Sequence, residues 1–251
     1  MDFIITSIIT IIIILSLIVL LLKIAKVGVK WIIIIASILA LLSIVFGINL
    51  FQDISELREN LPKAQNLILL KNNNIITGFT GNIISNNKVS YLNESQINSY
   101  KELYEKEDFD SMKDQYYKLI IIDKDIFDGD GKIVFNNHNV SVSKVISLIE
   151  SNNALEDSVS LIISMENLIE NNNLRNYIKD RLKSENGVLI DNDMKAILFA
   201  SLINQEDKAA LLNGVKTNKV LIYPNTITFK IVKIIPGILS ENIIKKMVVM
   251  Q

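Results

Sequence analysis

Near its start the chain reads FIITSIITIIIILSLIVLLL at residues 3–22 and WIIIIASILALLSIVFGINL at residues 31–50, two stretches without a charged residue. A helix rises about 1.5 Å per residue, so each stretch spans about 30 Å, the thickness of the hydrocarbon core of a bilayer. The sequence therefore predicts two transmembrane helices. The lead-in Met1–Asp2 carries no Lys or Arg, and no Ala-x-Ala cleavage motif follows, so we expect the first helix to be retained rather than removed as a signal peptide.

The loop at residues 23–30 predicts how this hairpin is oriented. It is short, so the two helices must run antiparallel, and it contains Lys23, Lys26 and Lys30. Short loops rich in lysine stay on the cytoplasmic side. The flank after the second helix has only Arg58 and Lys63 as basic residues. We therefore expect an integral protein of the cell membrane, with the loop in the cytoplasm and the rest of the chain outside.

Small residues follow one face of the second apolar stretch, at Ala36, Ala40, Ser43 and Gly47. Small side chains let helices approach closely in lipid. The favoured interpretation is packing against the first helix of the same hairpin. The alternative is a docking face for a partner membrane protein.

The remaining sequence predicts a linker at 52–65 and one soluble α+β domain at 66–251, so the hairpin occupies residues 1–51. Strand patterns come first and helix patterns later, which favours α+β over alternating α/β. Asn66–Lys71 and Asn74–Thr80 predict a β-hairpin around an asparagine turn, and Gly78 indicates a bulge or a close backbone approach. The other strands are expected at 116–127, at 132–135 paired beside it, and at 220–223.

Helical periodicity predicts helices at 94–108, 142–149, 155–169, 174–182, 194–204, 229–235 and 238–249. Ser141 and Asp193 are candidate N-caps, and the helix that begins at residue 174 is expected to end before Gly187. The last helix has a broad apolar face beside Lys245 and Lys246. It could lie in the membrane interface, but we favour a helix that closes the domain core.

Composition excludes several classes of protein. The 251 residues are 49% hydrophobic and 21% charged, with a formal charge of −1 and no cysteine. Such a chain is not disordered, and it has no disulfide, zinc-thiolate site or cysteine nucleophile. It also lacks the basic excess typical of nucleic-acid binders. Arginine is rare and asparagine and isoleucine are abundant, a bias that AT-rich coding gives. No phosphate-binding, GxSxG or HExxH motif is present, and we expect no cofactor.

One carboxylate cluster is a candidate metal site. Asp123, Asp125, Asp128 and Asp130 could offer oxygen ligands to Ca²⁺. Aligned on a calcium loop, however, Ile126 takes the first ligand position and Asn137 takes the position that needs a bidentate glutamate. A β-turn is therefore the favoured interpretation, with a weak cation site as the alternative.

Other polar residues carry little chemistry. The single histidine, His138, lies between two asparagines and is expected in a solvated loop. Ser143 and Lys144 are adjacent, but a Ser/Lys dyad is formed in space rather than in sequence. Asn93 and Asn139 begin glycosylation sequons, which an asparagine-rich chain contains by chance.

These observations favour a membrane-anchored, non-catalytic module for binding or assembly, with the lipid bilayer as its first partner. Two alternatives stay open. One is an enzyme at the membrane surface, whose carboxylates converge only in the fold. The other is an accessory subunit of a multi-span channel or transporter, held through the second helix.

Overall fold

The structure is a computed structural model that describes residues 11–19, 29–61, 63–81, 89–127, 131–187, 190–205 and 208–234. It divides into two units, Met1–Ser55 and Glu56–Gln251, and each is described by itself.

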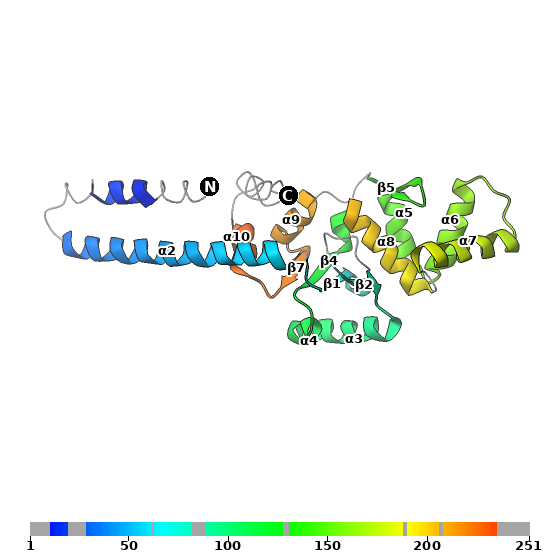
Figure 1. The fold of residues 1–251 in the computed structure, drawn as a ribbon, viewed down its shortest axis with the longest axis horizontal. Coiled ribbons are helices and arrows are strands. Elements are labelled where there is room, and N and C mark those ends of the chain that lie inside the picture. The colour runs from blue at the N-terminus through cyan, green and yellow to red at the C-terminus, as the bar shows by residue number, and fades with distance from the viewer. Residues whose placement is uncertain are drawn as a thin grey trace. The chain divides into compact units, whose positions relative to one another are not determined.

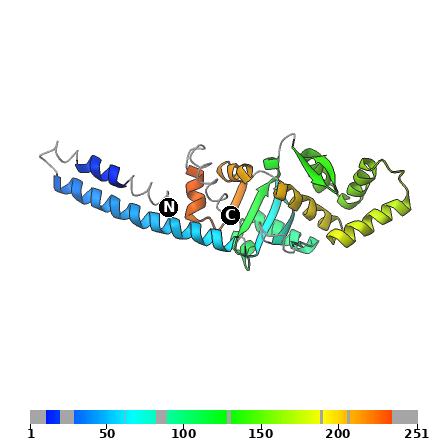
Figure 2. The same ribbon diagram turned by 45° about the horizontal axis from the view of Figure 1, so that its top comes forward.

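The first unit is helical. Residues 11–19 form one helix, and α2 (Val29–Asn60) begins in this unit and ends in the next. The shorter helix lies beside α2 in both ribbon views (Figures 1 and 2). Among the described residues, one helix is long and apolar enough to cross a membrane, at Ile35–Leu57. The helix predicted at 31–50 is thus present and extends ten residues further, to Asn60.

The second unit is an α+β fold around a mixed five-stranded sheet in the order β3-β2-β1-β4-β7 (Figure 2). The predicted hairpin of β1 and β2 is confirmed. β1 pairs in parallel with β4, and the other pairs are antiparallel. The strands are β1 (Asn66–Asn72), β2 (Asn74–Gly81), β3 (Ser90–Tyr91), β4 (Leu119–Asp123) and β7 (Val220–Tyr223).

Both faces of the sheet are covered, which explains why β1 and β4 are continuously apolar. On β1, Ile68 and Leu70 belong to one core, while Leu67 and Leu69 belong to the other. The smaller core lies under α3 (Glu94–Glu105) and α4 (Phe109–Lys113). The larger core is built by α5 (Val142–Glu150), α6 (Ala154–Met165) and α8 (Asp191–Gln205).

The short strand predicted late in the sequence, at 220–223, is confirmed as β7. β7 comes after α5, α6, α7 (Asn172–Asn186), α8 and α9 (Lys208–Lys216), and it pairs with β4 on the side away from β1. The short apolar run at 220–223 was predicted as a strand, but a run of four residues does not specify its partner. Two long β4 side chains, Ile120 and Ile122, therefore belong to a core that is completed late in the sequence.

The predicted pairing of residues 132–135 beside β4 is also wrong. β5 (Lys132–Phe135) pairs with β6 (His138–Ser141) as a separate two-stranded sheet. The turn between them is Asn136–Asn137, and both residues have positive φ, 49° and 64°. Asparagine tolerates this conformation, and a two-residue turn of this kind matches the twist of a hairpin. His138 accordingly stands in a strand, not in a loop.

Several helix ends differ from the predictions because single residues leave the helical conformation. The helix predicted at 94–108 ends at Glu105 as α3, and the short helix α4 begins beyond the predicted range, with Glu107 at a φ of 54° between the two. The helix predicted at 155–169 ends at Met165, shortly before Asn167 at a φ of 53°. The predicted strand at 116–127 is confined to β4 and is followed by a 3₁₀ turn, η1 (Lys124–Phe127). Helix α8 begins at Asp191, so Asp193 lies in its first turn, where its carboxylate accepts from the Ile190 N–H.

Other ends are confirmed. The Ser141 hydroxyl caps α5, and Gly187 ends α7 in the left-handed conformation. Helix α9 was not predicted, α10 spans Ile227–Ile234, and the predicted helix at 238–249 lies outside the described residues.

Candidate functional site

The carboxyl ends of the two parallel strands form the first candidate site. Lys71, one residue before the end of β1, and Asp123, the last residue of β4, lie side by side as register partners. The chain then leaves the two strands in opposite directions, to β2 on one side and eventually to β7 on the other. In open α/β sheets, ligands bind outside the carboxyl ends of strands at such a point.

An ion pair occupies this edge. The Lys71 Nζ lies 2.5 Å from the Asp123 Oδ2, and both side chains are about one-fifth exposed. Burial acts to raise the pKa of Asp123, but hydrogen bonds from Lys71 and the Asp125 N–H outweigh it and hold the pKa below 3.8. Burial likewise acts to lower the pKa of Lys71, and the hydrogen bond to Asp123 outweighs it and raises the pKa above 10.5. Both groups are therefore charged at neutral pH.

A second carboxylate joins the edge to α5. The Glu150 Oε1 accepts from the Asn72 Nδ2 at 2.8 Å and from the Lys124 Nζ at 2.6 Å. The Lys219 Nζ donates to the Asp125 carbonyl at 3.1 Å. Each of the two carboxylates therefore has a cationic partner, and the network holds the ends of β1 and β4 against α5.

An aromatic pocket lies beside this edge, against the α3–α4 turn. It encloses about 480 Å³ and is lined by Asn73, Asn74, Tyr104, Glu105, Glu107 and Phe109. The rings of Tyr104 and Phe109 are 6.4 Å apart, and the Phe109 ring is 5.9 Å from that of Tyr223. We call this cavity the aromatic pocket. Its volume falls in the range of small-ligand sites.

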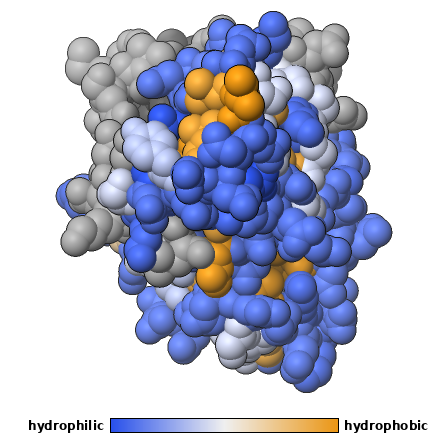
Figure 3. Space-filling view, turned by 90° about the vertical axis from the view of Figure 1, so that its right-hand side faces the viewer, coloured by the Kyte–Doolittle hydropathy of each residue, from blue (hydrophilic) through white to orange (hydrophobic). Residues whose placement is uncertain are grey.

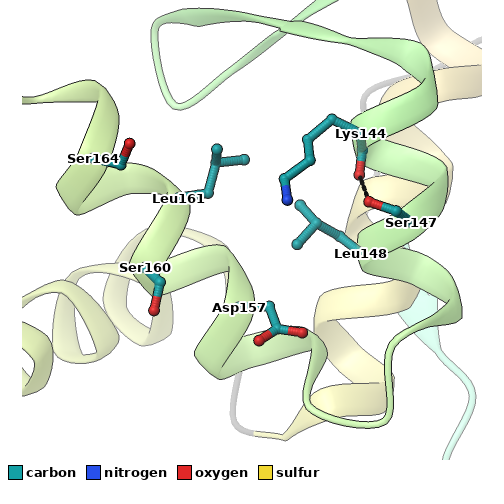
Figure 4. Close-up of a pocket in the computed structure, with 7 residues that line it drawn as sticks. All are labelled: Lys144, Ser147, Leu148, Asp157, Ser160, Leu161 and Ser164. Carbon is teal, nitrogen blue, oxygen red and sulfur yellow. Dashed lines mark hydrogen bonds between the residues drawn. The ribbon is translucent and has the colours of Figure 1, made fainter.

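A groove between α5 and α6 is the third candidate (Figure 4). It encloses about 430 Å³, and the Lys144 amine points into it, toward the side chains of Leu148 and Leu161. The Ser147 hydroxyl donates to the Lys144 carbonyl at 2.7 Å, and the Ser143 Oγ lies 3.2 Å from the Ser141 Oγ. The structure thus gives these hydroxyls partners other than the Lys144 amine, and the Ser143–Lys144 pair forms no dyad.

The predicted cation loop is only partly described. Asp123 is held by Lys71, Asp125 is exposed in η1, and Asp128 and Asp130 lie outside the described residues. Within the described ranges, no group of three or more His, Asp or Glu side chains is placed to hold a metal ion. His138 lies 4.0 Å from the Glu166 Oε1, which also accepts from Arg181 at 3.3 Å.

The four residues of the predicted small-residue face differ in how far they are exposed. Ala36 is only 9% exposed and Ala40 is half-buried, whereas Ser43 and Gly47 are exposed. Of the loop lysines, Lys23 and Lys26 lie outside the described residues, and Lys30 falls in the first turn of α2.

No family model, curated protein or solved structure matches the chain. The function is therefore argued from these sites alone. The sequence contained a signal for the first of them, because Lys71 and Asp123 each follow a run of buried apolar residues. Tyr104 and Phe109 gave no such signal, since they meet only where the chain bends between α3 and α4.

Proposed function

We propose that the protein is a membrane-anchored module that binds or assembles with a partner and does not itself catalyse a reaction. In this proposal the α+β unit is held beside the cell membrane by two helices, with the lysine loop in the cytoplasm and the α+β unit outside. The bilayer is its first partner.

The observation that carries the proposal is the exposure of α2. Among the described side chains from Ile35 to Phe51, the large apolar ones are between 47% and 63% exposed. Nine such side chains on one helix form an apolar surface that is unfavourable in water and favourable in lipid. Apolar residues of the 11–19 helix are similarly exposed, which supports a second span.

The α+β unit has a different surface. Its exposed large apolar residues in the described ranges are few: Val134, Leu168, Ile169, Tyr177 and Ile190. Figure 3 shows one of its ends, where small hydrophobic patches are surrounded by hydrophilic residues. This contrast supports water as the solvent of the second unit and lipid as that of the first.

No described Asp or Glu with a resolved pKa shift has the raised pKa of a general acid. Among the described Asp and Glu residues, those with a resolved shift are Asp108, Asp123 and Glu156, and in each the pKa is lowered. Hydrogen bonds from Ser111 lower that of Asp108, and hydrogen bonds from Arg175 and Lys179 lower that of Glu156. A general acid at neutral pH needs a raised pKa instead.

Alkaline extraction of membranes, followed by the intact mass of the extracted chain, tests the anchor. We expect the full chain to stay in the membrane pellet and to dissolve only with detergent. A chain released by alkaline buffer, or one that lacks the first apolar stretch because it served as a signal sequence, would overturn the proposal. Digestion of intact cells with protease tests the orientation, and we expect the α+β unit to be cleaved.

A further inference from the structure

The rings of the aromatic pocket are held in fixed positions. The Tyr104 and Phe109 rings are inclined at 58°, and Phe109 also contacts Tyr223. The Tyr223 hydroxyl donates to the Asp110 Oδ1 at 2.6 Å, which fixes the far end of this row of rings. Aromatic rings carry a negative face that attracts cations.

The rim of the pocket is negatively charged. The Glu105 Oε1 accepts from the neutral Asn74 amide at 2.6 Å, a contact that leaves the charge in place. Within the described part of the chain, neither Glu105 nor Glu107 forms an ion pair. The neighbouring ammonium of Lys71 forms its ion pair with Asp123 and also interacts with the Tyr104 hydroxyl. The stretch around these rings, residues 102–110, contains five carboxylates and a single lysine.

Rings and carboxylates together suit an organic cation. A hard metal ion prefers a shell of oxygen ligands, whereas an ammonium or guanidinium group gains from ring faces and carboxylates at once. We propose that the aromatic pocket binds the charged end of a lysine or arginine side chain presented by a partner protein. This inference rests on the proposed function of assembly and names the chemistry of the partner.

The test is a titration of the full chain in detergent micelles, with 3-fluorotyrosine in place of tyrosine and the Tyr104 resonance assigned through Tyr104→Phe. The probe is the peptide acetyl-Gly-Arg-Gly-amide. Its matched control carries citrulline, which has the same shape without the charge. We expect the arginine peptide to shift the Tyr104 resonance in a saturable way and the citrulline peptide to leave it unchanged.

Two variants locate the binding. The ring-deletion variant Phe109→Leu should weaken binding about threefold to thirtyfold, the range expected for a lost cation–π contact. The double variant Glu105→Gln, Glu107→Gln should weaken it about fivefold to tenfold. The control Glu102→Gln removes a charge from the same helix outside the pocket and should change binding less than twofold.

Three results would overturn the inference. One is that the arginine peptide produces no shift of the Tyr104 resonance, and another is that the citrulline peptide produces the same shift as the arginine peptide. The third is that Glu102→Gln weakens peptide binding as much as the double variant Glu105→Gln, Glu107→Gln does. The last would indicate a diffuse acidic surface. If putrescine shifts the resonance and the arginine peptide does not, the pocket takes a free amine, and the partner side chain is excluded. Alkaline extraction of the same variants measures membrane anchoring independently of peptide binding. A pocket that binds no peptide therefore does not count against the proposed membrane anchor.

Discussion

At the scale of single residues, Gly78 decides whether β1 and β2 can lie together. A Cβ at this position would lie 2.5 Å from the Leu69 Cδ2 and 2.6 Å from the Ile68 carbonyl oxygen. We expect Gly78→Ala to lower the free energy of unfolding by about 1–3 kcal/mol, since backbone must move. The control Gly81→Ala, whose nearest atom is 3.7 Å away, should change it by less than about 0.5 kcal/mol. Equal urea midpoints for the two variants, measured by near-ultraviolet circular dichroism, would refute this.

The Lys71–Asp123 pair makes a pH-dependent contribution. The pKa of Asp123 is lowered by folding, so its stabilisation is complete above the ordinary 3.8 and is lost as the pH falls through the folded value. The pKa of Lys71 is raised, so its stabilisation is complete below 10.5 and is lost as the pH rises through the folded value. We expect Asp123→Asn to cost roughly 1 kcal/mol at pH 7.

The check is the difference in urea midpoint between the wild type and Asp123→Asn, measured across pH. It should narrow below about pH 4 and again at strongly alkaline pH. If the difference in urea midpoint stays constant over this pH range, the loss of stability in Asp123→Asn comes from packing rather than from charge.

At the scale of elements, helix α3 depends on its first residues. The Asn93 side chain accepts from the Gln96 N–H at 2.9 Å, and the Gln96 side chain accepts from the Asn93 N–H at 2.9 Å. This reciprocal cap gives Asn93 a structural role independent of its glycosylation sequon. We expect Asn93→Ala to lower the free energy of unfolding by about 1 kcal/mol. Asn98→Ala, on the exposed side of the same helix, is the control and should be neutral or slightly stabilising in the same urea experiment.

The elements also show what the sequence could predict. The β1–β2 hairpin, the strand at 220–223, the Ser141 cap and the Gly187 helix end follow from local chemistry, and they are correct. The partners of β5 and β7 are not local properties. The Asn136–Asn137 turn was a usable signal for β5–β6, because paired asparagines favour a tight hairpin. The aromatic pocket could not be predicted, because the φ of Glu107 brings its rings together.

At the scale of the whole molecule, our proposal gives the first unit lipid as its solvent and the second unit water. A charged side chain introduced into α2 tests whether lipid surrounds that helix. Val45 lies within the apolar part of α2 and is 55% exposed. A lysine near the centre of a membrane helix costs about 2.5–3.5 kcal/mol of insertion free energy. We expect Val45→Lys to reduce the fraction of chain that resists alkaline extraction, whereas Gln52→Lys, nearer the polar end, should leave it unchanged. Unaltered extraction of Val45→Lys would show that α2 does not depend on lipid.

The late arrival of β7 has a consequence for biosynthesis. β4 leaves the ribosome about a hundred residues before the strand that pairs with it. During that interval its outer border presents free amide and carbonyl groups next to isoleucines, which is the kind of surface that joins to a neighbouring chain. A nascent or truncated polypeptide that ends before Val220 therefore leaves this edge of β4 open to aggregation, and the edge is covered only once residues 220–223 have been synthesised and have paired with it.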